Sequence, residues 1–456
     1  MTTTATAPAT TEVARGRWLA DWRPEDAGFW ESTGRRIARR NLLASVFSEH
    51  VGFSVWSMWS VFVLFLGPAY GLSADPKHAA AEKFLLTSLP TALGAGARLP
   101  YTFAVAKFGG RNWTIASTAL LLIPLVTTAV LLRPGVGFGT LLVLAALTGV
   151  GGGNFASSMT NINSFYPQRL KGAALGLNAG GGNIGVAIVQ LVGLAVLATA
   201  GKDHPRVLVG VYLPLVVLAI VTAAFAMDNI AHVRNEKGAM RDASKDINTW
   251  LVAVLYIGTF GSFIGFGFAF GQVLTNQFGG HFLAASGKVD PVKVAYLTFL
   301  GPLIGSLIRP IGGWLADRFG GARTTFWNFA AMAVSGLVVW VASRDESLGL
   351  FYVGFLLLFV LSGLGNGSVY KMIPTIFKAR TSTEHEARRL ANAVIGIAGA
   401  VGAFGGVLVN VAFRQSFLSS GTGDGAYLAF IAFYVLCLVI TWSVYVRPSA
   451  VRRAGI

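Results

Sequence analysis

The sequence predicts an all-helical protein that spans a membrane twelve times, in two related bundles of six helices. Hydrophobic residues make up 54% of the 456 residues and charged residues only 12%, against roughly a quarter charged in soluble domains. Apolar stretches long enough to cross a bilayer recur along the chain, without the alternation of a β-barrel. The expected spans are 41–67, 84–106, 113–132, 137–162, 170–199, 207–228, 249–275, 293–315, 324–343, 350–378, 388–413 and 425–447.

The net charge of +16 is distributed as in a membrane protein. Most Lys and Arg residues outside the spans lie on the side that holds both termini, which the positive-inside rule makes the cytoplasm. Residues 1–40 and 448–456 are therefore expected to be cytoplasmic tails, the first dozen residues disordered, with no signal peptide. A basic cluster flanks the first span and sets its orientation, so nucleic acid is not an expected partner. The cluster is Arg35, Arg36, Arg39 and Arg40.

The sequence offers no metal, cofactor or disulfide site. Cys437, in the last span, is the single cysteine, so a disulfide within the chain is impossible. The six histidines are scattered without metal-ligand spacing. We expect no cofactor and no enzyme activity.

The two halves of the chain repeat one plan. Arg98 and Arg309 each lie in an apolar stretch and are each followed, ten residues later, by Phe-Gly-Gly. Asn154 follows Arg98 by 56 residues, and Asn366 follows Arg309 by 57. Because the copies are six helices apart, they share one orientation, as in a parallel repeat about the membrane normal. The expected segments are a bundle at 41–228, a cytoplasmic linker at 229–248 and a bundle at 249–447.

The two intramembrane arginines are the first functional candidates. Each costs about 2.5 to 3.5 kcal/mol to insert at membrane depth, so matched positions indicate a shared task. Substrates of such repeats bind near the midplane where the halves meet, which predicts that Arg98 faces Arg309. Glu49 is the only acidic residue well within a span and cannot neutralise both. We therefore expect the pair to hold an anion, for which a guanidinium offers paired planar donors.

Two stripes of glycines occupy one face of the fifth and eleventh spans. Small residues at this spacing let helices approach closely and slide past one another. Ordinary close packing is the alternative for either stripe. The stripes are Gly172, Gly176 and Gly180, and Gly396, Gly399 and Gly402.

One loop resembles a signature of the major facilitator superfamily. The segment 312–323, with Asp317 and Arg318, is similar to the cytoplasmic loop in which Asp and Arg residues latch neighbouring helix ends. The first-half copy has Ala106 and Lys107 in place of the acidic residue, so the latch is expected mainly in the second half. The resemblance implies the major facilitator fold.

Longer motifs resemble the nitrate/nitrite porter (NarK-type) family. The segments 151–167 and 171–185 are similar to its nitrate signature, and 363–374 with 391–406 is similar to the second copy. The similarity extends from Trp22-Arg-Pro-Glu-Asp to the last span. It implies transport of nitrate and nitrite by alternating access across a bacterial cytoplasmic membrane, by a monomer in the lipid bilayer.

The same resemblance implies roles for individual residues. The family's two substrate arginines fall on Arg98 and Arg309, its polar partner falls on Asn183, and its aromatic walls fall on three further residues. Without the resemblance, helix packing is the better explanation of these rings, and the amide could equally well bond a neighbouring helix carbonyl. The aromatic residues are Phe155, Tyr256 and Phe260.

The mode of coupling depends on three further ionisable residues. Members of the family exchange nitrate for nitrite or carry nitrate with protons, and two fixed arginines favour exchange because an empty, doubly positive site should reorient slowly. Glu49 or His50 could instead carry a proton, or Glu49 could form a fixed ion pair with Arg40 or Lys371. Lys371 could extend the anion path, or reach to the helix end without a role in transport.

Other functions fit the sequence less well. A facilitator for organic anions, drugs or sugars would need a larger polar lining, although another small anion stays open. A sensor or enzyme would need a catalytic or signalling domain, which the sequence lacks. An anion channel would carry currents larger than a rocking carrier sustains.

Overall fold

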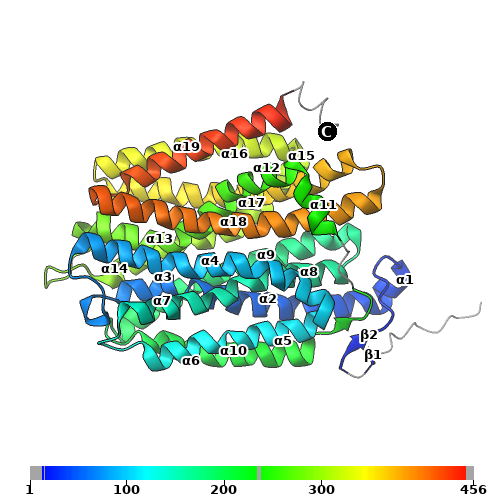
Figure 1. Cartoon of the computed structure of the whole chain (residues 1–456), viewed down its shortest axis with the longest axis horizontal. Helices are drawn as coiled ribbons and strands as arrows, with labels where there is room; N and C mark the ends of the chain where they lie inside the picture. The colour runs from blue at the N-terminus through cyan, green and yellow to red at the C-terminus, as the bar shows by residue number, and fades with distance from the viewer. Residues whose placement is uncertain (1–12, 15, 234–237, 448–456) are drawn as a thin grey trace, which may run out of the picture.

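The computed structural model describes residues 13–14, 16–233 and 238–447, and it is a bundle of long helices lying roughly side by side (Figure 1). The helices of the first half occupy one side of the bundle and those of the second half the other. The N-terminal strands and the last described residues lie at one end (Figure 1), which we call the termini end. The expected disordered dozen and the tail 448–456 lie outside the described residues.

The first half contains ten of the helices that the structure labels α, with three short irregular turns. The apolar stretches of the sequence become helices because a bilayer leaves no other partner for backbone polar groups. In chain order they are α1 (Ala27–Phe29), η1 (Trp30–Gly34), α2 (Arg35–Ser57), α3 (Trp59–Phe65), η2 (Pro68–Tyr70), α4 (Pro76–Phe108), α5 (Gly110–Leu120), α6 (Leu122–Leu131), α7 (Phe138–Leu147), η3 (Thr148–Gly153), α8 (Asn154–Phe165), α9 (Gln168–Thr199) and, as the tenth α helix, α10 (Arg206–Ala226).

The second half begins after a short polar connection and follows the same plan. Side-chain caps start several of its helices, as where Asp246 accepts from the backbone nitrogen of Asn248 at 2.9 Å. In chain order they are α11 (Ala239–Lys245), α12 (Ile247–Tyr256), η4 (Ile257–Gly261), α13 (Ser262–Gln277), η5 (Gly279–Phe282), α14 (Pro291–Thr298), α15 (Leu300–Phe319), α16 (Gly321–Arg344), α17 (Leu348–Arg380), α18 (Glu384–Ser420), α19 (Asp424–Thr441) and η6 (Trp442–Val446).

All twelve expected spans fall on helices, although not all meet a strict test for crossing a membrane. In the described part of the chain, 10 helical segments are long and apolar enough to do so. The exceptions are the first two spans, formed by α2 with α3 and by α4. These carry Glu49, His50 and Arg98 among their apolar residues, which lowers their hydropathy. The count of twelve stays a prediction.

The repeated Phe-Gly-Gly motif has the same conformation in both halves. Gly109 and Gly320 have φ values of 87° and 89°, a region that favours glycine. Each donates its N–H to the carbonyl four residues earlier and ends its helix, and the next helix begins at the second glycine. The motif therefore sets the sharp turns from α4 to α5 and from α15 to α16.

Residues 13–14 and 16–34, expected to belong to a tail, are folded against the termini end. Strands β1 (Val13–Ala14) and β2 (Trp18–Leu19) pair antiparallel, and β2 pairs parallel with β3 (Asn229–Ile230) in the linker. Apolar side chains of this segment pack against the end of α8. They are Leu19, Trp22, Phe29 and Trp30, against Phe165.

A buried carboxylate ties this segment to the first half. Asp228 accepts from Arg17 at 3.0 Å, from Arg40 at 2.5 Å and from the Asn41 amide at 2.9 Å. The side chain of Asp228 is 1% exposed. One acid thus joins the N-terminal segment, α2 and the start of the linker.

The linker helix α11 is held against α18 at the termini end. Arg389 donates to Asp242 at 2.6 Å, and this hydrogen bond keeps the pKa of Asp242 below its ordinary value.

The halves pack through α4 against α18 and through α9 against α15. Toward the end opposite the termini, Thr87 donates to Asn410 at 2.8 Å. Phe84 stacks on Phe413 with ring centroids 5.6 Å apart, and Gln190 donates to the Gly267 carbonyl at 2.7 Å. These contacts close the interface between the halves on that side.

Replacing Asp228 by Asn should destabilise the protein, because the amide removes the charge that two arginines share. Loss of these charge-assisted bonds should lower the free energy of unfolding by about 1–3 kcal/mol. The measurement is thermal unfolding of the detergent-purified chain. Asp345→Asn, which alters an exposed residue, is the control and should melt like the unmodified protein. Equal melting temperatures for both variants would contradict this role of Asp228.

Candidate anion-binding site

Arg98 lies in the interior of the bundle, on α4, with 1% of its surface exposed. Its Nη1 donates to the Gly399 carbonyl of α18 at 3.0 Å. Its guanidinium carbon lies 4.7 Å from the ring centroid of Phe155 and 4.9 Å from that of Phe260. The positive charge is therefore held by a helix carbonyl and aromatic faces from both halves.

Arg309 lies on α15 with 6% of its surface exposed. Its Nη2 donates to the Tyr256 hydroxyl at 3.0 Å. Its guanidinium carbon is 6.0 Å from the centroid of Phe155 and 5.9 Å from that of Phe260. Because these are the rings that Arg98 contacts, the two arginines converge on one place between the halves.

The predicted aromatic residues form one continuous stack. Phe155 stacks on Phe260 at 6.0 Å, and Phe260 stacks on Tyr256 at 5.1 Å. Tyr256 stacks in turn on Tyr370 at 4.5 Å. The stack crosses from α8 of the first half to α17 of the second and forms a flat wall beside both arginines.

Irregular helix geometry presents these rings. Phe155 is the second residue after the 3₁₀ turn η3, and Phe260 lies in the π-helical turn η4 that begins after Tyr256. Such turns shift the direction of side chains relative to a straight α-helix and are frequent at functional sites.

Several donors at this place have no hydrogen-bond partner among the described residues. They are Nε and Nη2 of Arg98 and Nη1 of Arg309. An unpaired buried donor costs about 1–3 kcal/mol, and more when charged. The open donors of two cations beside a flat aromatic wall can bind a small planar anion.

Asn183 is buried on α9, and neither atom of its amide has a partner in the described chain. The amide is free to bond a ligand or a water. Its contact with the bound anion stays a prediction.

The sequence did not single out two aromatic residues of the site. The Arg309 guanidinium carbon lies 5.5 Å from the Tyr370 ring centroid, and that of Arg98 lies 5.6 Å from Trp56. Tyr370 stands in the second-half signature directly before Lys371, a position that could have drawn attention to it. Trp56 carries no such signal, because tryptophans are common in apolar spans.

Glycines let three segments meet beside Arg98. A Cβ added to Gly152 would lie 2.7 Å from the Gly94 Cα and 2.8 Å from Trp56 Cε2, and one added to Gly153 would lie 2.6 Å from the Tyr101 ring. The glycine-rich start of the signature thus leaves room for the backbone of α4 and for the Trp56 and Tyr101 side chains to approach η3 closely.

Glu49 is buried on α2 and forms no ion pair with a described residue. Its Oε2 accepts from the Asn178 amide at 2.7 Å and from the Ser158 hydroxyl, while Oε1 has no partner among the described residues. The charges of Arg98 and Arg309 act on it at longer range. The alternative of a fixed pair with Arg40 or Lys371 is wrong, since those residues bind Asp228 and Asp317.

His50 follows Glu49 and faces α9 as well. Its Nδ1 lies 3.2 Å from the Gly181 carbonyl. When Nδ1 carries a proton, it can donate a hydrogen bond to this carbonyl, which fixes the orientation of the ring.

Lys371 lies away from the arginines, at the level of the last turn of α15. Its Nζ is 2.8 Å from Asp317, and the two side chains are 43% and 61% exposed. Of the two interpretations of Lys371, this placement agrees with a lysine that reaches to a helix end and not with one that extends the anion path. The pair joins α15 to α17, the kind of contact expected of the latch, although the cation is Lys371. Arg318 instead lies over the Trp314 and Phe319 rings.

The two predicted glycine stripes have different surroundings. A Cβ on Gly172 or Gly176 would meet no atom within 4 Å, and one on Gly180 would approach only Ser306 of the opposite half, at 4.0 Å. The close packing of α9 on α2 comes from Gly182 and Gly185 instead, which face Glu49 and the His50 carbonyl.

The stripe on α18 borders the arginine site. A Cβ added to Gly396 would lie 3.1 Å from Met240 and 4.0 Å from Thr102. One added to Gly399 would lie 3.2 Å from the Tyr370 hydroxyl, and one added to Gly402 would meet the Tyr256 ring. Sliding along either stripe stays a prediction.

Comparison with known proteins identifies the family. The sequence profile of the Major Facilitator Superfamily matches residues 50–410. The nitrate/nitrite transporter NarU of Escherichia coli (strain K12) is 36% identical, over 94% of this chain and 96% of its own length. This chain belongs to the nitrate/nitrite porter family of the major facilitator superfamily. The family predicted from the signatures is therefore confirmed.

Other members and solved structures agree with this assignment. The probable nitrate/nitrite antiporter NarK2 of Thermus thermophilus is 33% identical to this porter over 96% of the chain and 98% of its own length. The xylose transporter XylE from E. coli, in a partially occluded inward open conformation, matches with a TM-score of 0.68 at 13% identity, covering 90% of this chain and 98% of its own. The structural match confirms the major facilitator fold.

Replacing Gly152 by Ala should disturb the helix junction of this porter. The added methyl meets backbone and an indole, so about 1–3 kcal/mol of stability should be lost. Stabilisation of the protein by a bound oxyanion should weaken too, because α4 carries Arg98. Both effects are measured as melting temperatures with and without the anion. Gly139→Ala, where an added Cβ meets no atom within 4 Å, is the matched control, and identical behaviour of the two variants would refute the junction.

Proposed function

We propose that this porter transports nitrate and nitrite, holding the anion between Arg98 and Arg309. The observation that carries the proposal is the convergence of both guanidinium groups on the Phe155 and Phe260 rings, with three charged donor atoms that have no hydrogen-bond partner in the described part of the chain. Relatives named nitrate/nitrite transporter and nitrate/nitrite antiporter support the choice of anion.

The chemistry of the site suits a small planar oxyanion. Each guanidinium presents donors in a plane that matches the oxygens of nitrate or nitrite. The ring faces limit the height of the site and exclude water, which strengthens the charge interaction in low-dielectric surroundings. Asn183 and the Tyr256 hydroxyl add hydrogen-bonding groups.

Anion binding would couple directly to the rocking of the two halves. Arg98 belongs to the first half and Arg309 to the second, so an anion that binds both draws the halves together. An empty site leaves two positive charges facing each other. Reorientation should therefore be slow without a bound anion, which favours exchange of nitrate for nitrite.

The proposed mechanism also assigns roles to the two bundles, to the glycine stripes and to the membrane orientation. The bundles 41–228 and 249–447 would rock about the site, with the glycines of α9 and α18 on the moving faces. The protein would act as a monomer in a bacterial cytoplasmic membrane, with both termini in the cytoplasm. The Lys371–Asp317 pair would then lie near the cytoplasmic surface.

Lysine at either arginine position should abolish most transport. Arg98→Lys and Arg309→Lys keep the charge but lose the planar pair of donors, so uptake of labelled nitrate into proteoliposomes should fall about tenfold or more. Arg206→Lys, at an exposed position, serves as control and should leave uptake unchanged. Near-normal uptake by either of the two site variants, at equal protein content, would overturn the proposal.

Proton symport is a second candidate, favoured by the surroundings of Glu49. A buried carboxyl without an ion pair can take up a proton at low cost. An ionised Glu49 would leave the empty site with one net positive charge. When nitrate binds and Glu49 takes up a proton, the net charge of the site is again one positive charge. The loaded porter and the empty porter could therefore both reorient.

Glu49→Gln separates the two candidates. Uptake of labelled nitrate is compared in vesicles preloaded with nitrite and in empty vesicles with an imposed proton gradient. For an exchanger, only internal nitrite stimulates uptake, and the variant behaves like the unmodified porter. For a symporter, the gradient drives uptake, and the variant loses that response while it retains exchange. Glu31→Gln, at an exposed position, controls for loss of one acid, and retained gradient-driven uptake in Glu49→Gln would exclude Glu49 as the proton carrier.

A further inference from the structure

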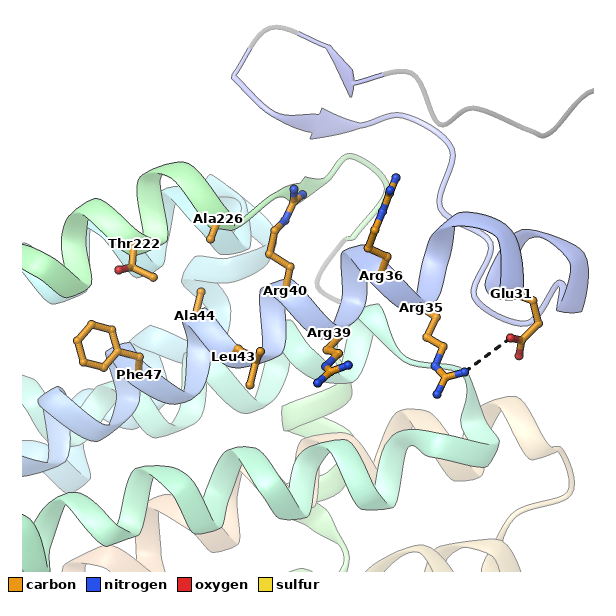
Figure 2. A pocket seen from close by; sticks show the side chains of 10 residues that line it. All are labelled: Glu31, Arg35, Arg36, Arg39, Arg40, Leu43, Ala44, Phe47, Thr222 and Ala226. Atoms are coloured by element: carbon orange, nitrogen blue, oxygen red, sulfur yellow. Dashed lines mark ion pairs between the residues drawn. The ribbon is translucent and has the colours of Figure 1, made fainter.

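A basic groove lies at the termini end, between α2 and α10, away from the arginine site. Figure 2 shows its lining side chains. The groove has a volume of about 700 Å³, which is large enough for part of a lipid molecule. Its lining comprises Glu31, Arg35, Arg36, Arg39, Arg40, Leu43, Ala44, Phe47, Thr222 and Ala226.

The charges of the groove are only partly compensated. Arg40 binds Asp228 at 2.5 Å, and Arg35 lies 3.9 Å from Glu31. Arg36 and Arg39 form no ion pair with any described residue and are exposed. They stand one turn apart on α2, and Figure 2 shows their side chains extending to opposite sides of the helix in this view. Both side chains are long enough to turn toward one anionic group bound between them.

Apolar side chains continue the groove toward the middle of the bundle. Leu43 is 54% exposed between the two walls, and Figure 2 shows Leu43 and Phe47 following Arg39 along α2, with Thr222 and Ala226 on the opposite helix. The distance from Arg35 to Phe47 along a helix is about 18 Å. This length covers a lipid headgroup and the first part of an acyl chain.

We propose that the groove binds an anionic phospholipid, with its phosphate at Arg36 and Arg39 and an acyl chain along Leu43 and Phe47. Charge asymmetry across a membrane accounts for basic residues near a helix end. It does not account for a groove in which unpaired arginines lead directly to an exposed apolar floor. The combination is complementary to a molecule that is anionic at one end and apolar at the other. This inference does not depend on the identity of the transported anion.

Lipid titration of the purified full-length porter tests the proposal. Native mass spectrometry in detergent would compare phosphatidylglycerol with phosphatidylcholine of the same acyl chains. We expect clear preference for the anionic lipid, and about 30-fold weaker binding of it to Arg36→Gln/Arg39→Gln, since each arginine near an anionic surface contributes roughly 1 kcal/mol. Arg241→Gln/Lys378→Gln removes two exposed charges elsewhere at the termini end and should leave binding unchanged.

A second variant tests the apolar part. Ala226→Phe fills the groove and leaves all four arginines in place, so it should also weaken phosphatidylglycerol binding. Glycerol 3-phosphate, which has the headgroup charge without acyl chains, should not compete. The proposal is overturned if both lipids bind equally, if the control pair weakens binding as much as the groove pair, if Ala226→Phe binds like the unmodified porter, or if glycerol 3-phosphate displaces the lipid.

Discussion

Two buried guanidinium charges, without a carboxylate partner among the described residues, are the constraint around which this bundle is built. Arg98 and Arg309 are surrounded by ring faces, one helix carbonyl and one phenol hydroxyl. These groups lower the cost of burying each cation but do not neutralise it. In the proposed function a mobile anion would complete the site and still leave, whereas a fixed acid would occupy it permanently.

Bringing these charges together requires helices that approach unusually closely. The contacts of Gly152 with Gly94 and Trp56 fix α2 and α4 beside the turn that presents Phe155. On the other side, Gly399 and Gly402 leave room for Tyr370 and Tyr256. Glycines around the site therefore allow the close packing that positions the rings and guanidinium groups. Because they lack side chains, they also leave few projecting atoms at the interface between the halves.

Sequence reasoning recovered the features that depend on repetition and composition. The offset between the copies predicted that Arg98 and Arg309 face each other, and the Phe-Gly-Gly turns have matching geometry. It missed features set by distant pairing. The contact of Lys371 with Asp317 joins residues 54 positions apart, and nothing local distinguishes it from a lysine on an anion path. The fold of residues 13–14 and 16–34 depends on the linker and on Phe165, so local composition alone suggested a tail.

The shared carboxylate of Asp228 has a consequence for the order in which the chain can be completed. Arg17 is synthesised 211 residues before Asp228, which at usual rates of translation is roughly 10 to 40 s earlier. Strand β2 likewise waits for β3. The N-terminal segment therefore cannot reach its final place until the helices of the first half, through α10, have been made, so its docking requires a completed first half.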